Sequence, residues 1–156
     1  MELQDTGIKM IGDVNIKVFG ADGSLKEEKQ VKNLVVSVGK TYIANRMQSN
    51  SIQSVMNTMA IGVGTTTPAA TQTALISEAG RVATSSFSSG GTSGNEVTAT
   101  ATFPAGTGTG SITEAGIFNP ATAGGAGGTM MCRTTFPVVS KAAGDSIAVT
   151  WKVTVS

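Results

Sequence analysis

The chain has 156 residues, eleven basic and ten acidic side chains, a formal net charge of +1, and no histidine. This balance gives no electrostatic reason to expect a nucleic acid or a membrane as partner. Without imidazole the chain lacks the commonest general base and metal ligand, so we expect a structural protein rather than an enzyme, with no catalytic, cofactor or metal residues. Its length fits one domain, 1–156.

Residues 9–36 predict a β-hairpin. Val14, Ile16 and Val18 alternate with less apolar positions, 21–24 supply an Asp-Gly turn, and the return strand runs over 25–36. Opposed Lys and Glu across a hairpin usually form a solvated edge that blocks aggregation. As a second interpretation, we expect 1–36 to be an N-terminal arm, with the core strands beyond residue 32, that contacts a partner through Lys17, Lys26, Glu27, Glu28, Lys29 and Lys32.

One short helix is predicted over about 39–47, with Tyr42, Ile43, Arg46 and Met47 on one face. A strand follows at 59–64. The next segment, 65–74, is rich in threonine and contains Pro68, which has no amide hydrogen to donate, so it predicts a connecting loop.

Five further strands are expected, mostly separated by glycine-rich turns. Their approximate ranges are 80–88, 96–103, 111–118, 129–136 and 146–155. The last one alternates strictly and places Trp151 on its apolar face. Many short strands at this spacing favour a sandwich or a barrel. We expect an all-β fold, a β-sandwich of jelly-roll or immunoglobulin-like type, with one short helix and the N-terminal hairpin.

Two short motifs suggest chemistry that their surroundings do not support. Gly39-Lys40-Thr41 resembles the end of a phosphate-binding loop, but the glycine required five residues earlier is Leu34. Asp5-Thr6-Gly7 matches the aspartic-protease triplet without the buried strand that normally precedes it. Both predict ordinary structural positions.

Isolated reactive or charged side chains also favour structural roles. Cys132 is the only cysteine, so it forms no intramolecular disulfide, and its strand predicts a small buried residue. Glu114 lies in a strand-like stretch and is expected to pair with Arg81 or Arg133. The scattered cations Arg81, Arg133, Lys141 and Lys152 are expected to be solvated.

The first residues show no basic segment followed by an apolar run, so no signal peptide is expected. No stretch approaches 18 apolar residues, so no membrane span is expected either. Both observations predict synthesis in a cytoplasm.

Three stretches together resemble a family of small structural proteins in the virions of tailed bacteriophages. The first is Asn33–Met47 and the second is Ala60–Leu75. The third begins at Ile112–Asn119 and continues to the terminal strand through 130–131, 133–137 and 143–147. Chains of this kind resemble head decoration (cement) proteins as well as tail or fibre accessory proteins.

The resemblance implies a β-sandwich, often in trimers, and carries over no catalytic residue. It leads us to expect a decoration protein on the outer capsid surface of the virion, made in the host cytoplasm. Its partners would be the major capsid protein and itself, as a homotrimer. The alternative is a tail, neck or fibre module that binds a virion partner or a host surface ligand.

Overall fold

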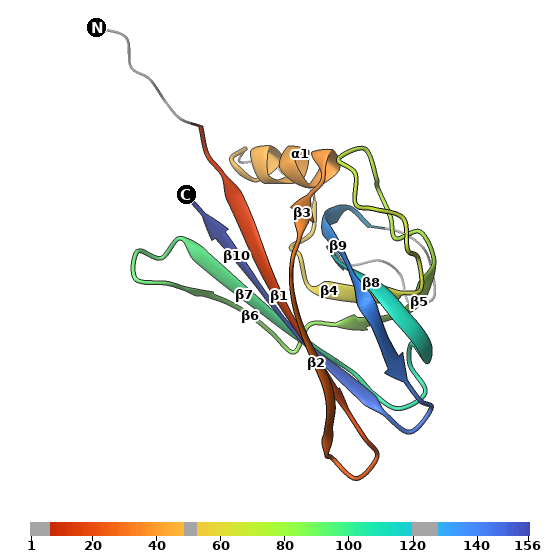
Figure 1. Cartoon of the computed structure of the whole chain (residues 1–156). Helices are drawn as coiled ribbons and strands as arrows, with labels where there is room; N and C mark the ends of the chain where they lie inside the picture. Colours follow the sequence, from red (N-terminus) through yellow and green to blue (C-terminus); the bar gives the residue numbers. More distant parts are fainter. Residues whose placement is uncertain (1–6, 49–52, 120–127) are drawn as a thin grey trace, which may run out of the picture.

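Alternation of apolar and polar residues produces two antiparallel five-stranded sheets in the computed structural model, which describes residues 7–48, 53–119 and 128–156 (Figure 1). The first sheet has the spatial order β2 (Leu25–Lys32), β1 (Met10–Phe19), β10 (Ser146–Val155), β7 (Glu96–Phe103) and β6 (Ser86–Gly90). The second has the order β3 (Leu34–Val35), β9 (Met130–Lys141), β8 (Gly110–Phe118), β4 (Thr58–Gly62) and β5 (Glu78–Ala83). The predicted all-β sandwich is confirmed.

The main core lies between the two sheets. Trp151 on β10 and Phe103 on β7 are both fully buried, and they pack in one cluster with Ile61, Ile112 and Ile117 of the second sheet. The apolar sides of β1, β7 and β10 therefore face inward, as their period of two predicts.

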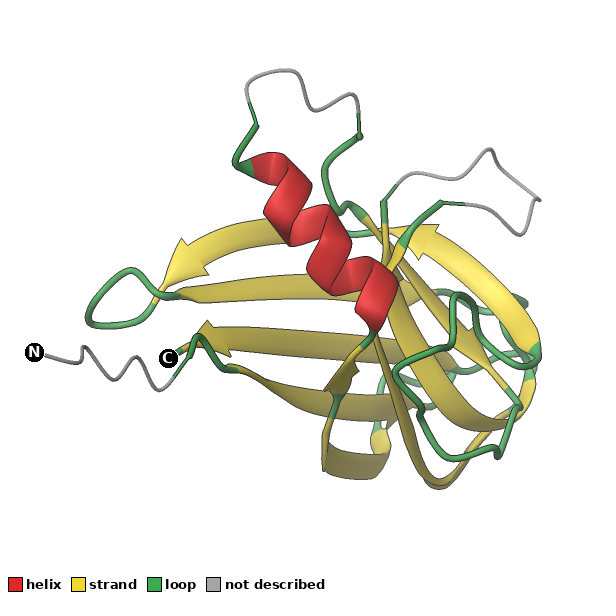
Figure 2. Ribbon diagram, turned by 90° about the horizontal axis from the view of Figure 1, so that it is seen from above, coloured by secondary structure: helices red, strands yellow, loops and turns green. Residues whose placement is uncertain are grey.

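The one helix of the described residues, α1 (Ser37–Arg46), lies across the end of the sandwich at which β1 begins and β10 ends (Figures 1 and 2). It begins two residues before the predicted start, and it buries Gly39 and Tyr42. A side chain at Gly39 would collide with the backbone of Met131 on β9, so glycine permits this close packing. Of the residues on the predicted face, Tyr42 is buried, whereas Arg46 is exposed and Met47 is 84% exposed.

Two segments that the sequence predicts as single strands are each divided between the sheets. The return strand of the hairpin ends at Lys32, and after Asn33 the chain joins the other sheet as β3, paired with β9. The segment 80–88 likewise becomes β5 in one sheet and β6 in the other. At that crossing, the Thr84 amide donates to Asn57 O, next to β4 of the second sheet, at 2.8 Å. The Ser85 amide donates to Thr100 O, on β7 of the first sheet, also at 2.8 Å. The chain therefore passes from one sheet to the other between these two residues.

Strand β9 continues beyond its predicted end at Phe136. Pro137 cannot donate to a β-ladder, yet the pairing with β8 resumes at Val139, opposite Ile112, after a register shift. The register shift accommodates the proline, so the strand continues past it.

The predicted hairpin forms, but it is not a separable arm. Strand β1 lies between β2 and β10, and its Val14, Ile16 and Val18 are at most 1% exposed. The expectation that the core strands lie beyond residue 32 is therefore wrong. The physical reason is that the alternation along β1 gives it an inward apolar face as complete as that of β10.

Candidate functional site

Among the ion pairs of the described residues, one on the second sheet is distinguished by having both side chains fully buried. Glu114 on β8 and Arg133 on the neighbouring strand β9 are both fully buried. One carboxylate oxygen, Oε2, accepts hydrogen bonds from Arg133 Nε at 2.9 Å and Nη2 at 2.7 Å. The expected pairing of Glu114 with Arg133 is confirmed.

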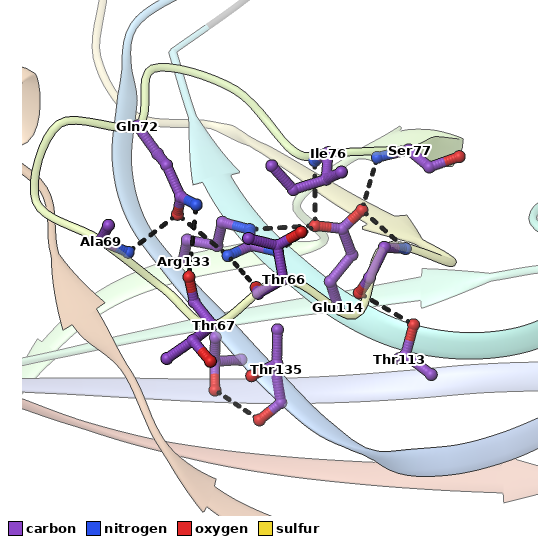
Figure 3. Close-up of polar contacts among 12 residues, drawn as sticks. Thr66, Thr67, Ala69, Gln72, Ile76, Ser77, Thr113, Glu114, Arg133 and Thr135 are labelled. Carbon is purple, nitrogen blue, oxygen red and sulfur yellow. Dashed lines mark hydrogen bonds and ion pairs between the residues drawn. The ribbon is translucent and has the colours of Figure 1, made fainter.

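The same two side chains fasten the long connection between β4 and β5, residues 63–77, onto the sheet (Figure 3). Glu114 Oε1 accepts from the amides of Gly64 at 3.0 Å and Ser77 at 2.8 Å, and Oε2 accepts from Ile76 at 3.1 Å. These bonds hold both ends of the connection to one carboxylate.

Arg133 holds the middle of the connection. Its Nη1 donates to the Thr66 carbonyl and to Gln72 Oε1, both at 2.9 Å. Gln72 Oε1 also accepts from the Ala69 amide at 2.9 Å. The loop expected at 65–74 is thus present, and the connection that contains it is anchored by one ion pair through five of its residues (Figure 3).

Glycines beside the carboxylate make this arrangement possible. A Cβ atom at Gly64 would lie 2.5 Å from Glu114 Oε1, and one at Gly62 would lie 2.6 Å from the same oxygen. Only a residue without a side chain leaves room for the carboxylate to reach the Gly64 amide.

The environment of Glu114 favours its ionised form. Burial by itself acts to raise the pKa of this carboxyl group. The hydrogen bonds from Ser77, Arg133 and Ile76, together with the arginine charge, outweigh burial and hold the pKa below its usual value. Because the pair is completely buried and each carboxylate oxygen accepts at least two hydrogen bonds, its evident role is to fix the fold.

Acid should destabilise the protein through this group. Because the pKa of Glu114 is lower in the folded state, the unfolded state takes up the proton first as pH falls below about 4.3. The full contribution of the ionised Glu114 carboxylate to the free energy of unfolding is present above that pH. It is lost as the pH falls further, through the pKa that Glu114 has in the folded state. In urea titrations at stepped pH, we expect Glu114→Gln to reduce the slope of unfolding free energy against pH in this range.

Some slope should remain in that variant. The pKa of Asp145 is also lowered, first by the hydrogen bond from Lys26 and then by the Ala142 amide, so it acts in the same direction. An acid slope in Glu114→Gln identical to that of the unaltered chain would contradict the assignment.

The other cations expected to be solvated divide into two kinds. Lys152 is half-exposed and pairs with Glu96 at 3.2 Å, as expected. Lys141 is buried instead, and its Nζ donates to the Pro104 carbonyl at 3.0 Å. Burial lowers the pKa of Lys141. For Arg133 and Lys141 the expectation of solvation is therefore wrong, because other loops cover their strands.

Arg81 pairs with Glu78 of its own strand, with Nη2 2.6 Å from Oε2, so the alternative pairing with Glu114 is wrong. Its guanidinium also lies 4.1 Å from the centroid of the Phe118 ring. The two contacts fix Arg81 on the outer side of the second sheet.

The motifs judged structural from the sequence have such positions where they are described. Cys132 is buried between neighbouring strands, and burial raises the pKa of its thiol. Gly39-Lys40-Thr41 lies inside α1, with Gly39 against β9. Of the Asp5-Thr6-Gly7 triplet, Asp5 and Thr6 lie outside the described residues.

The six charged residues proposed to contact a partner lie on the β1–β2 hairpin, and each has a local counterion. Lys17 pairs with Glu28 across the hairpin at 3.7 Å, and Lys29 pairs with Glu27 at 3.0 Å. Lys26 pairs with Asp145 of the β9–β10 turn at 2.6 Å, and Lys32 pairs with Asp13. The structure thus places the six residues on the two outermost strands at one edge of the first sheet, where each charge is compensated by a neighbour within the chain.

A second surface, which the sequence reasoning missed, lies at the end of the sandwich crossed by α1. A groove there, which we call the α1 groove, is lined chiefly by Met10, Tyr42, Ile43, Met56, Phe87 and Val153. These residues come from five separate elements or loops, so no single stretch of sequence indicates the groove. A run of apolar residues around Lys9, of which Ile8 is 80% exposed and Ile11 is 47% exposed, is a local signal of the surface that adjoins the groove.

No family model, curated protein or solved structure matches this chain. Within the described ranges, no helix is long and apolar enough to cross a membrane. In the same part of the chain, no three Cys, Asp or Glu side chains gather as a possible metal site.

Proposed function

We propose that the chain is a bacteriophage capsid decoration (cement) protein, which binds the outer surface of an assembled head and stabilises contacts between major capsid proteins. The proposal begins from the resemblance of 33–47, 60–75 and the C-terminal third to virion proteins. The observation that carries it is the apolar end of the sandwich, where Met47 is 84% exposed and Val55 is 54% exposed. Apolar side chains gathered in this way are typical of an association surface.

The architecture suits a clamp. Two sheets share one core, and the buried Glu114–Arg133 pair holds the longest described connection, so the module can present its surfaces in fixed positions. A protein that binds the assembled shell but not the free subunits stabilises the shell by mass action. Many identical copies strengthen this effect through avidity.

Two surfaces are available for such contacts. The charged edge of the hairpin, with Lys17, Lys26, Glu27, Glu28, Lys29 and Lys32, remains a proposed contact, although its charges already have partners within the chain. The α1 groove is the second. Assembly of the protein as a homotrimer remains a prediction.

Particles that lack this protein should assemble in normal yield but release their DNA at a lower temperature than complete particles. The measurement is the thermal release of DNA, followed with a dye, before and after the purified protein is added back. Adding it back should restore the higher temperature. Particles that are equally heat-stable without the protein but fail to adsorb to host cells would replace decoration with the tail or fibre alternative.

A further inference from the structure

Most, but not all, of the positively charged side chains of this protein form ion pairs. All eleven lysines and arginines lie within the described residues, and seven of them form ion pairs there. Lys141 is buried and donates to a carbonyl oxygen. The remaining three, Lys9, Lys40 and Arg46, have no carboxylate within ion-pair distance among the described residues; Arg46 is exposed, and its Nη1 donates to the Gln53 carbonyl at 3.1 Å.

These three cations border the same apolar surface. Arg46 lines the α1 groove, and Lys9 and Lys40 line a second depression on the other side of the helix. The two depressions share Met10 and Ile43, so they form one continuous surface. No aspartate or glutamate lines either depression.

We propose that this surface, the α1 groove with the adjoining depression, binds a segment of a partner protein in which apolar side chains alternate with aspartate or glutamate. The groove supplies buried apolar contact area, and the three cations supply the charge complement that steers and orients an acidic segment. The inference deepens the proposed function and rests on it only in assuming a protein partner.

Other occupants fit these observations less well. Three cations are too few for a nucleic acid surface, where each neutralised phosphate needs its own cation. They also fall short of the four to eight, roughly, that typify recognition of acidic lipids. A second copy bound through the same surface about a two-fold axis would bring like charges together.

The test is a titration of the isotope-labelled full chain, followed by nuclear magnetic resonance, with two synthetic peptides. One peptide alternates leucine or phenylalanine with glutamate, and the other has lysine in place of every glutamate. The acidic peptide should shift amide signals of α1, of residues 53–57 and of the adjoining ends of β1 and β10. The basic peptide should leave these signals unchanged.

Charge reversal locates the binding. Lys9→Glu/Lys40→Glu should weaken binding of the acidic peptide about tenfold, because each of two exposed contacts changes from attraction to repulsion. Both side chains project from exposed positions, so the fold is retained. The matched control Lys17→Glu/Lys29→Glu reverses two charges on the hairpin edge and should leave the affinity unchanged. Met47→Ser/Val55→Ser, which removes exposed apolar contacts, should also weaken binding.

Several results would overturn the inference. These are equal binding of both peptides, shifts centred on the hairpin, or an affinity unaffected by Lys9→Glu/Lys40→Glu. Binding seen only with Glu2→Gln/Asp5→Asn would assign the surface to the chain's own acidic N-terminal segment. A dimer whose contacts map to the same amides would assign it to a second copy. None of these results determines the outcome of the DNA-release experiment, because a protein that binds the capsid through the hairpin would still stabilise the capsid against heat.

Discussion

Replacing Arg133 with alanine is expected to lower the free energy of unfolding by about 3–5 kcal/mol, the range measured when one partner of a buried ion pair is removed. The change leaves the Glu114 carboxylate fully buried without its counterion, and it removes the Arg133 donor from the Thr66 carbonyl and from Gln72 Oε1, which keeps only the Ala69 amide. Urea unfolding followed by circular dichroism measures the loss. The connection 63–77 should also become more accessible to protease.

Two further variants distinguish the cost of leaving one buried charge without its counterion from the cost of losing an ion pair as such. Arg133→Met/Glu114→Gln removes both charges, while the glutamine oxygen can still accept from backbone amides, so it should cost less than Arg133→Ala alone. Lys152→Ala breaks a partly exposed pair with Glu96 and should cost under about 1 kcal/mol. If Arg133→Ala cost no more than Lys152→Ala, the pair would not be the anchor of the loop.

The period-two pattern predicts the fold well where a strand has one apolar face. Strands β7 and β10 have their predicted bounds because burial of Phe103 and Trp151 requires that alternation. The same pattern does not say which sheet a residue joins. At Asn33 and at Thr84–Ser85 the chain changes sheets while remaining extended, and that choice depends on partners far along the sequence, such as Cys132 and Thr100.

Residue type predicted that Glu114 would pair with Arg81 or Arg133, but neither the choice of Arg133 nor the burial of the pair. The two side chains are removed from water by the connection 63–77, whose path depends on the pair itself, so neither feature can be inferred without the other. The α1 groove was missed for a related reason. Met10, Phe87 and Val153 become neighbours only after the sheet has formed and the helix has packed on β9.

Deleting residues 1–32 is expected to abolish folding rather than to release a functional sandwich without its arm. Burial of Val14, Ile16 and Val18 contributes about 1.5–3 kcal/mol each, which together approaches the whole net stability of a domain, about 5–15 kcal/mol. The deletion also leaves β10 without its neighbour on one side and exposes its backbone groups. Nuclear magnetic resonance of the shortened chain should show the narrow amide dispersion of an unfolded protein.

A matched change on the same hairpin should leave the fold intact, because the edge charges contribute little to stability. Glu27→Thr/Lys29→Thr removes one partly exposed ion pair of β2 and should shift the free energy of unfolding by less than about 1 kcal/mol. Native dispersion in the chain lacking 1–32 would restore the view of the hairpin as a separable arm. Unfolding of that chain together with a native Glu27→Thr/Lys29→Thr variant would show that the hairpin stabilises the domain through its buried side chains and its pairing with β10, not through this ion pair.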